Sequence, residues 1–556
     1  MLPKRHFFYF LFIIVTVIYS LTSCSFFTVS YKNKAKIEVE HITATGDIHY
    51  EIDIKDEPVD IFFAFTNVNE MVGTDTPDVQ SESIVVNGQE FPAPIPIDFE
   101  YSAAAEGSMH AFINTSTRKL LASLHSDTIS KNSFPVPGVP SFDYENESAT
   151  FNDSDINDQM IPKNAHCRSV IGPILTSQGN RTLNIWVADD CWETDGTKKH
   201  LVTTEMITAL EDKFLKTGLD NDIYDWVTTI LGPEWGKTGY SNLIPPNNEI
   251  TILLSDINED NSDTGGVVGY FWAGNNFTAS SVSDSNERIM FVIDAVMYAN
   301  PSLDGSPTAT DTTGWTDSAF WPKFVFPTLA HEFQHMIHFY QKSFVANATA
   351  PTETWINEMC SMLIEDILAD KIGVEGPRGV SSLIGTAGSP GNIEGRLPIF
   401  NQYLTNEVIV TSNFGKIADQ YADYSVAYAF GAWLARNYGG VEFLHNVVSS
   451  PYTDKKAIEY AVQKYTGGAE SFERLLQRWG GAIFLSDKTD APLKYQYNSG
   501  GWFTSTINGK KYNLGSINLY NYDPSPEIAT STSQLASGLT ASGTNVYLLA
   551  KENALG

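Results

Sequence analysis

The chain has little cysteine for its length. Its 556 residues include four cysteines, and one of them, Cys24, belongs to a predicted export signal. The remaining three do not suit a structural zinc site built from thiolates. Cys167 and Cys191 flank a predicted strand pair and could form a disulfide in an oxidising compartment. Cys360 lies in an apolar helical stretch and is expected to be a buried thiol. Any metal site in this chain must therefore use histidine and carboxylate ligands.

Positive charge is also scarce. Lysine and arginine number 35 against 66 aspartates and glutamates, which gives a net charge of −31. A surface this acidic argues against binding of nucleic acid and against electrostatic docking on anionic lipid. High solubility is the simplest explanation of the acidity. Because 42% of the residues are hydrophobic and 18% are charged, most of the chain is expected to fold.

Long apolar runs are confined to the N-terminus, and no second run of about 20 residues follows. Two basic residues precede the apolar residues 7–18, and small residues then lead to Leu21-Thr22-Ser23-Cys24. These features predict a signal peptide over residues 1–23. The last four residues resemble a bacterial lipobox. That resemblance implies an exported lipoprotein whose one membrane contact is a lipid anchor at Cys24, on the outer membrane or cell surface. An ordinary signal peptide is the alternative.

Composition divides the rest of the chain into three parts. Residues 24–160 are rich in β-branched residues and predict a β-sandwich-like domain followed by a linker. Residues 165–490 begin with strand patterns and continue with helical ones, which predicts a single α+β domain. Residues 491–556 return to strand and turn signals and predict a β-rich C-terminal segment.

The most informative stretch is His331-Glu332-Phe333-Gln334-His335. Two histidines four residues apart on a helix point the same way and can chelate one zinc ion, and the glutamate beside the first can act on water at the metal. We expect the helix to begin at Pro327, since proline suits a first helical position. A solvated helix face with two unrelated histidines is the alternative. The opposite face of the helix is apolar and consists of Leu329, Phe333, Met336, Ile337 and Tyr340.

A zinc enzyme of this kind needs a third protein ligand and an open position for water. Glu358 lies 23 residues after His335, off the apolar stripe of a second predicted helix, and is the preferred candidate. An ordinary exposed glutamate is the alternative. His338 could bind in principle, but as a helix neighbour of His335 it is expected to point past the metal, toward solvent or in support of the site. Gln341 stands where a metzincin would carry its third histidine.

These segments resemble the hyicolysin family of secreted bacterial zinc metallopeptidases, within the gluzincin superfamily. The resemblance rests on LAHEFQHMIHFYQ and TWINEMCSMLIED and, upstream, on GGVVGYFWAG and SNERIMFVIDA, and it covers about residues 165–450. It implies a zincin-like catalytic domain, with a mixed sheet and a helical lower half, between the two β-rich parts. It also implies one zinc per chain, Glu332 as general base, and three zinc ligands, which are His331, His335 and Glu358.

One position departs from the pattern of thermolysin-like enzymes. Those enzymes carry an aspartate four residues after the ligand glutamate, and this chain has Met362 there. The group that orients a zinc-bound histidine must then come from elsewhere in the chain.

A third segment, residues 424–434, resembles the helix that carries the catalytic tyrosine in leukotriene-hydrolase-type aminopeptidases. On that comparison Tyr424 is the phenol that stabilises the oxyanion. Tyr421 and Tyr428 remain rivals, and all three tyrosines could instead pack in the core. The glycine pair Gly439-Gly440 predicts the end of this helix.

The implied activity is hydrolysis of peptide bonds by a zinc-activated water, with Glu332 as general base. Residues 288–293 form a candidate edge strand that could bind an extended peptide by strand addition. The chain has no clear Gly-x-Met-Glu-Asn segment of the kind that holds a free N-terminus. Both observations favour cleavage within chains, by a metalloendopeptidase that acts on extracellular proteins or peptides. The protein is expected to be a monomer. The alternatives are an aminopeptidase and a catalytically inactive surface-binding lipoprotein on a zincin scaffold.

A second metal signal is weaker. Carboxylates at alternate positions in residues 256–263 would suit calcium. Asn261 stands where the turn glycine of an EF-hand belongs, and Val267 stands where its last glutamate belongs. A solvated acidic turn is therefore preferred to a calcium site.

Overall fold

The computed structural model describes most of the chain from residue 142 onward. The described residues are 24–28, 40–44, 59–66, 84–86, 89–91, 119–120, 142–155, 159–303, 314–380, 383, 395–402, 420–526, 528–529 and 545–554. The signal peptide predicted over residues 1–23 lies outside them. Within the described ranges, no helix has the length and hydropathy needed to cross a bilayer.

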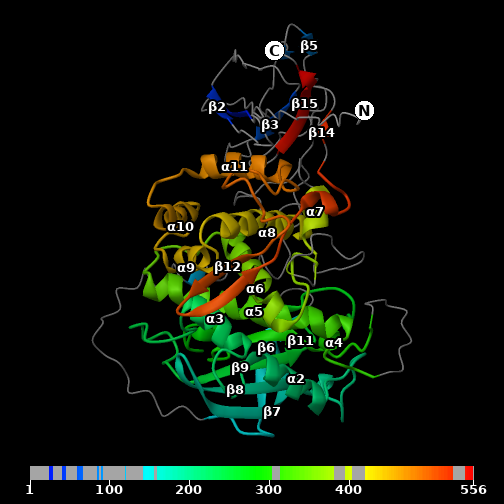
Figure 1. The fold of residues 1–556 in the computed structure, drawn as a ribbon. Helices are drawn as coiled ribbons and strands as arrows, with labels where there is room; N and C mark the ends of the chain where they lie inside the picture. Colours follow the sequence, from blue (N-terminus) through cyan, green and yellow to red (C-terminus); the bar gives the residue numbers. More distant parts are fainter. Residues whose placement is uncertain are drawn as a thin grey trace.

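A six-stranded sheet forms the lower part of the molecule (Figure 1). The order across the sheet is β10-β11-β9-β8-β7-β6, in which β8, β9 and β11 are parallel and the other pairs are antiparallel. The prediction of an α+β domain with a mixed sheet is confirmed. The strands are β6 (Ser148–Ser154), β7 (Met160–Thr176), β8 (Gly179–Ala188), β9 (Glu249–Ser255), β10 (Gly269–Tyr270) and β11 (Met290–Asp294).

One prediction about this sheet is wrong. The region 288–293, expected to be an edge strand, contains β11, which pairs with β9 on one side and with β10 on the other. All five residues of β11 are buried, which is typical of an interior strand covered on both faces. The edge is β10, and at two residues it is too short to show a periodic pattern in the sequence.

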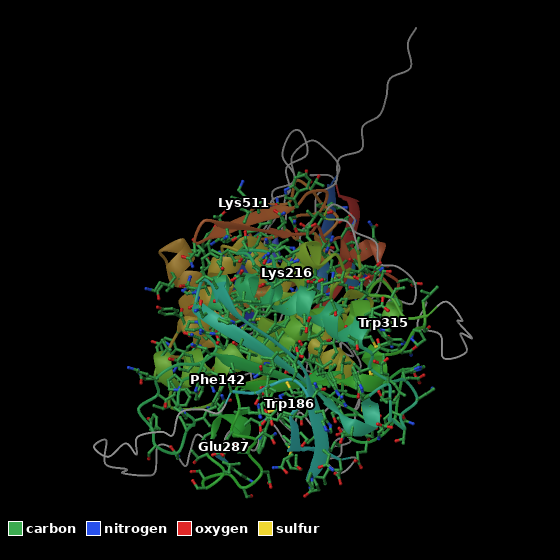
Figure 2. The ribbon with its side chains drawn as sticks, turned by 90° about the horizontal axis from the view of Figure 1, so that it is seen from below. Phe142, Trp186, Lys216, Glu287, Trp315 and Lys511 are labelled. Carbon is green, nitrogen blue, oxygen red and sulfur yellow. The ribbon has the colours of Figure 1, made fainter. Side chains whose placement is uncertain are left out.

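Apolar side chains project from both faces of the sheet and pack into two separate hydrophobic cores. The larger core lies between the sheet and the helices above it and includes Cys191. The smaller core lies on the lower face, where Figure 2 labels Trp186, and includes Cys167. Cys167 and Cys191 are therefore free thiols on opposite faces of the sheet, so the suggested disulfide is wrong. Cys360 is a buried thiol, as expected.

Helices cover the upper face of the sheet and then stack above it (Figure 1). The helices nearest the sheet are α2 (Thr204–Phe214), α3 (Ile223–Leu231), α4 (Ala295–Tyr298) and α5 (Phe320–Tyr340). The others are α6 (Thr354–Ile372), α7 (Leu397–Gln402), α8 (Gln420–Asn437), α9 (Val441–Ser449), α10 (Lys456–Thr466) and α11 (Phe472–Phe484). Short helical turns span Asp189–Cys191, Ala273–Asn276, Gln341–Val345 and Leu519–Asn521.

Helix α5 begins at Phe320, seven residues before the predicted start at Pro327. Pro322 lies in the first turn, where a missing N–H costs no intrahelical hydrogen bond. Trp321 and Val325 are buried, and this burial fixes the first turns against the core. Pro327 is therefore accommodated inside the helix, because packing outweighs the bond that the proline removes.

The two ends of the chain share a sheet. Strand β3 (Val59–Thr66) pairs antiparallel with β15 (Asn545–Ala554), which also pairs with β14 (Ile528–Ala529). The other strands near the N-terminus form two-stranded pairs, namely β1 (Cys24–Thr28) with β2 (Glu40–Ala44) and β4 (Ile84–Val86) with β5 (Gln89–Phe91). The described strands thus do not establish the predicted N-terminal sandwich.

A hairpin that follows the helices packs into their core. It consists of β12 (Phe503–Ile507) and β13 (Lys510–Leu514). Tyr512 and Leu514 belong to the larger core, and the Tyr512 hydroxyl donates a hydrogen bond to the Trp226 carbonyl oxygen at 2.9 Å. Residues 503–514 are therefore part of the same packed body as α3.

Candidate metal centre

Helix α5 presents two imidazoles on one face. The ring centroids of His331 and His335 lie 4.8 Å apart, as expected for side chains four residues apart on a helix. Their side chains are 11% and 10% exposed, so both rings are largely buried. Leu329 and Phe333, on the other side of the helix, are fully buried and hold it against the core.

Helix α6 brings a carboxylate to the same point. Oε2 of Glu358 lies 3.2 Å from Nε2 of His331 and 3.4 Å from Nε2 of His335. The ligand atoms of the three residues all lie within 4.8 Å of one another. Tetrahedral bonds of about 2.0–2.1 Å to a zinc ion hold neighbouring ligand atoms roughly 3.3 Å apart. The three side chains therefore fit a zinc ion.

Close packing of α6 explains why Glu358 faces inward. Met359 and the other apolar residues of α6 are buried against α5 and α8. A Cβ atom at Gly431 of α8 would lie 2.5 Å from Cγ of Met359, so only glycine permits this approach. Glu358 is 3% exposed.

The pKa shifts of Glu358 and His331 are those expected of a carboxylate in contact with imidazoles. Burial alone would raise the pKa of Glu358, but the two neighbouring histidines outweigh it and hold that pKa well below its usual value. Burial alone would lower the pKa of His331, but hydrogen bonds to Glu358 and Glu365 raise it well above its usual value. Zinc binds neutral imidazole, so metal binding must release a proton from this cluster.

Glu332 lies beside the histidines and under the sheet edge. It is 4% exposed, and burial raises its pKa, although the neighbouring histidines partly oppose that effect. The backbone N–H of Phe271, the residue after β10, donates a hydrogen bond to its carboxylate. A Cβ atom at Gly269 would lie 3.1 Å from Cγ of Glu332, so strand and helix are in close contact here.

A carboxylate that the sequence reasoning missed supports His331. Oε1 of Glu365 lies 2.5 Å from Nδ1 of His331 and so fixes which ring nitrogen faces Glu358. Glu365 follows Glu358 by seven residues, which is about two turns and the same face of α6. The sequence already contained a signal for this role, because a carboxylate two turns after the ligand glutamate can replace the aspartate that is absent at Met362.

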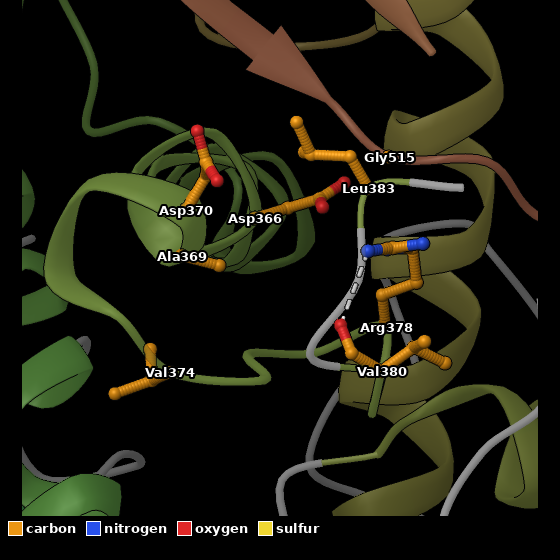
Figure 3. A pocket seen from close by; sticks show the side chains of 8 residues that line it. All are labelled: Asp366, Ala369, Asp370, Val374, Arg378, Val380, Leu383 and Gly515. Atoms are coloured by element: carbon orange, nitrogen blue, oxygen red, sulfur yellow. Dashed lines mark hydrogen bonds between the residues drawn. The ribbon is translucent and has the colours of Figure 1, made fainter. Parts of the chain in front are cut away.

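The two described rival tyrosines lie in different surroundings. Tyr424 is half-buried, and its pKa is raised by burial and then by the charges of Glu358 and Glu332. The pKa of Tyr428 is raised by burial and then by Asp366. Asp366 pairs with Arg436 of α8 at 3.0 Å and lines a small cavity with Arg378 and Val380 (Figure 3). The side chain of Tyr421 lies outside the described residues.

His338 is buried and belongs to a different hydrogen-bond chain. Its Nδ1 accepts from Nε2 of Gln334 at 3.0 Å, and its Nε2 donates to Oγ1 of Thr352 at 2.8 Å. Burial holds its pKa well below the usual value, so the ring is neutral. Both nitrogens are occupied, which leaves no lone pair for a metal. The ring is also not exposed to solvent, contrary to one of the expectations.

Two lysines from outside the acidic turn 256–263 form ion pairs with its carboxylates. Nζ of Lys198 lies 2.7 Å from Asp256, and Nζ of Lys199 lies 2.5 Å from Asp263. The backbone N–H of Asn261 donates to both carboxylate oxygens of Asp256. Ammonium groups already pair with Asp256 and Asp263, so the geometry does not support a calcium site.

Comparison with known proteins identifies the family of this chain. The sequence profile of the family described as peptidase M30 matches residues 164–517. The neutral metalloprotease ShpI of Staphylococcus hyicus is 22% identical over 321 residues, which cover 57% of this chain and 59% of ShpI. The chain therefore matches about three fifths of the length of that relative.

Two solved structures of an M1 zinc metallopeptidase from Deinococcus radiodurans, one of them a variant, were also found. They are 10% and 11% identical, cover 60% and 64% of this chain and 61% and 60% of theirs, and have TM-scores of 0.30 and 0.24. Scores this low carry no weight for the fold. The family match, which spans both metal-centre helices, confirms the resemblance found in the sequence: the chain belongs to the peptidase M30 family.

Proposed function

We propose that this protein is a zinc-dependent endopeptidase with a zincin-like catalytic domain. The observation that carries the proposal is the convergence of His331, His335 and Glu358, whose ligand atoms lie within 4.8 Å of one another beside the buried Glu332. When bound, zinc would lower the pKa of a coordinated water to about 7 and polarise the substrate carbonyl group. Membership of the peptidase M30 family supports the same activity.

The protein's own residues then have distinct roles. Glu332 accepts the proton of the attacking water and passes it to the leaving amine, and its burial next to two histidines suits a group that changes protonation. Tyr424 donates a hydrogen bond to the oxyanion that forms on the substrate. The raised pKa of the Tyr424 phenol keeps it protonated and able to donate a hydrogen bond. Glu365 holds the ring of His331 in position.

The sheet edge favours cleavage within chains. Strand β10 is the end strand of the six-stranded sheet, and an extended peptide can pair with such an edge. The segment from Gly269 to Ala273 contains no acidic residue that could hold a free amine above the site. An inactive binding protein would have no reason to keep Glu332 together with all three ligands. An aminopeptidase remains the second candidate for the experiment to exclude.

Mapping the cleavage sites in a mixed peptide library by mass spectrometry tests the proposal. We expect internal cuts that disappear with a chelator and return with added zinc. Stepwise loss of N-terminal residues would identify an aminopeptidase. Bound zinc without turnover of any unfolded protein would favour the inactive binding protein.

Tyr424→Phe tests the oxyanion role. Loss of one oxyanion donor costs about 10²–10³-fold in kcat, and we expect a fall of that size with little change in KM, since the donor acts in the transition state. Tyr428→Phe on the same helix is the control, because the pKa of that hydroxyl is raised by burial and by Asp366 and not by Glu358 or Glu332. A larger loss of kcat in Tyr428→Phe than in Tyr424→Phe would reverse the assignment.

Glu365→Gln tests the support of His331. Loss of a group that orients a metal ligand weakens metal binding by about 10–100-fold, and we expect a zinc Kd raised by that factor. Titration against a competing chelator measures it directly, without any assay of activity. Asp370→Asn, at an exposed position of the same helix, should leave the Kd unchanged. Equal affinities in the two variants would remove Glu365 from the site.

For location and partners we propose an exported lipoprotein anchored at the cell envelope through Cys24, monomeric, with protein or peptide substrates and no nucleic-acid partner. The basis is the sequence of residues 1–24 and the acidic net charge of −31. Mass spectrometry of the mature N-terminus tests the anchor, since an unmodified Cys24 would mean an ordinary signal peptide.

A further inference from the structure

The edge strand above the site is held by very few ladder contacts. Strand β10 consists of Gly269 and Tyr270, which pair with Ile293 and Val292 of β11. Two paired residues provide little stability in water. One more backbone hydrogen bond, from the Asp294 N–H to the Val268 carbonyl oxygen at 2.8 Å, lies beside this pair. Contacts outside the ladder therefore contribute to holding the strand in place.

On the upper face, the strand touches the catalytic helix. A Cβ atom at Gly269 would lie 3.0 Å from Cγ2 of Thr328 and 3.1 Å from Cγ of Glu332, both on α5. The N–H of Phe271 donates to the Glu332 carboxylate. The position of β10 and the position of Glu332 are thus coupled.

On the lower face, the strand is tied to a buried acid. Side chains alternate along a strand, so Tyr270 points away from α5. Its hydroxyl donates a 2.5 Å hydrogen bond to Oδ1 of Asp153, at the end of β6. Tyr270 is 2% exposed and Asp153 is 0% exposed. Burial, followed by the charge of Asp153, raises the pKa of Tyr270 well above its usual value, so the phenol remains a donor.

Asp153 is itself fixed by further polar contacts. Its Oδ2 lies 3.2 Å from Nζ of Lys163, which also donates to the Asp256 carbonyl oxygen at 2.6 Å. Its Oδ1 accepts a second hydrogen bond from the N–H of Ser154 at 2.8 Å. The carboxylate therefore has two partners besides the tyrosine, the Lys163 ammonium group and the Ser154 N–H, and these hold it in place as an anchor for the Tyr270 hydroxyl.

We propose that the Asp153–Tyr270 hydrogen bond positions the edge strand for catalysis. Tyr270 acts as a positioning residue, because it touches neither metal nor reacting atoms but fixes where the Phe271 N–H meets Glu332 and where the free edge of β10 meets the substrate backbone. This inference rests on the proposed peptidase function. It assigns a role in that function to a contact on the opposite face of the sheet.

Tyr270→Phe is the test. The ring still fills the lower core and Asp153 keeps Lys163, so the variant is expected to fold. We expect KM for a peptide substrate to rise about tenfold, the size expected from loss of a hydrogen bond to a charged group, and kcat to fall less. Loss of folded protein alone would lower kcat in proportion and leave KM unchanged.

Two variants complete the design. Tyr512→Phe removes a hydroxyl from an equally buried tyrosine whose partner is the Trp226 carbonyl oxygen, and it should leave KM unchanged. Asp153→Asn keeps an oxygen acceptor for Tyr270 and should retain a KM nearer to that of the wild type than Asp153→Ala does. An unchanged KM in Tyr270→Phe would overturn the proposal.

Hydrogen exchange of the metal-free chain gives a second readout that needs no activity. In Tyr270→Phe the Phe271 amide should exchange about tenfold faster, while amides in the middle of α5 are unaffected. Unaltered exchange at Phe271 would overturn the positioning role. If the wild-type chain shows no chelator-sensitive cleavage, the proposed function fails, yet this exchange measurement still decides whether the bond holds the strand.

Discussion

Glu332→Gln is expected to abolish peptide hydrolysis while zinc stays bound. The side chain sits between the two histidines in sequence, is 4% exposed, and lies beside the cluster without being one of the three close ligand atoms. Glutamine keeps the shape and can still accept the hydrogen bond from the Phe271 N–H, but it cannot take a proton from water. General acid–base catalysis contributes about 10²–10⁴-fold, and we expect kcat to fall by at least that much.

The measurement pairs the rate of cleavage of a fluorogenic peptide with metal analysis of the same sample. One zinc per chain together with the loss of rate would separate catalysis from metal binding. Glu442→Gln, at an exposed position in the first turn of α9, is the control and should keep full activity. Undiminished hydrolysis in Glu332→Gln would eliminate this residue as the base.

The second large effect is expected from Glu358→Ala, which should lose the metal itself. Oε2 of Glu358 lies 3.2 Å and 3.4 Å from the two imidazole nitrogens, and it is the carboxylate of the predicted ligand set. Loss of a group that only orients a ligand weakens binding about 10–100-fold, and loss of a direct ligand must cost more. Activity should vanish together with the zinc.

Metal content after dialysis against a weak chelator measures this effect. The comparison with Glu365→Gln is informative, because the orienting residue should give a weakened site and Glu358→Ala an empty one. Added zinc should restore activity in Glu365→Gln at a higher concentration than in the wild type. Full zinc content in Glu358→Ala would mean that a different side chain completes the site.

The parts of the site that lie on one helix could be predicted from the sequence. His331 and His335 are four residues apart, and helical geometry brings such residues together without reference to the rest of the chain. The end of α8 could also be predicted from the glycine pair Gly439-Gly440. In the structure these residues have φ angles of 105° and 64°, a region that favours glycine. Glu358 was predicted from its spacing after His335 and its place off the apolar stripe, together with the family resemblance, but spacing alone does not say which way a second helix faces.

Other features depended on contacts between distant segments. The edge strand was assigned to residues 288–293 because its pattern is strong, whereas the real edge has two residues and no pattern. The cysteines at 167 and 191 seemed close along the chain, but the sheet separates them into two cores. The pairing of β3 with β15 joins residues nearly 500 apart, a distance over which local pattern carries no information.

The sequence by itself determined the chemistry available to this protein: two imidazoles and a carboxylate on one helix, an apolar face to bury that helix, and too few thiolates for another kind of zinc site. Periodicity is a property of single elements, so it suffices for these statements. Only the tertiary structure placed Glu358 beside both imidazoles, showed that Glu365 supports His331, and brought Tyr270 through the lower core to Asp153. These contacts arise from packing between elements, which no local pattern encodes.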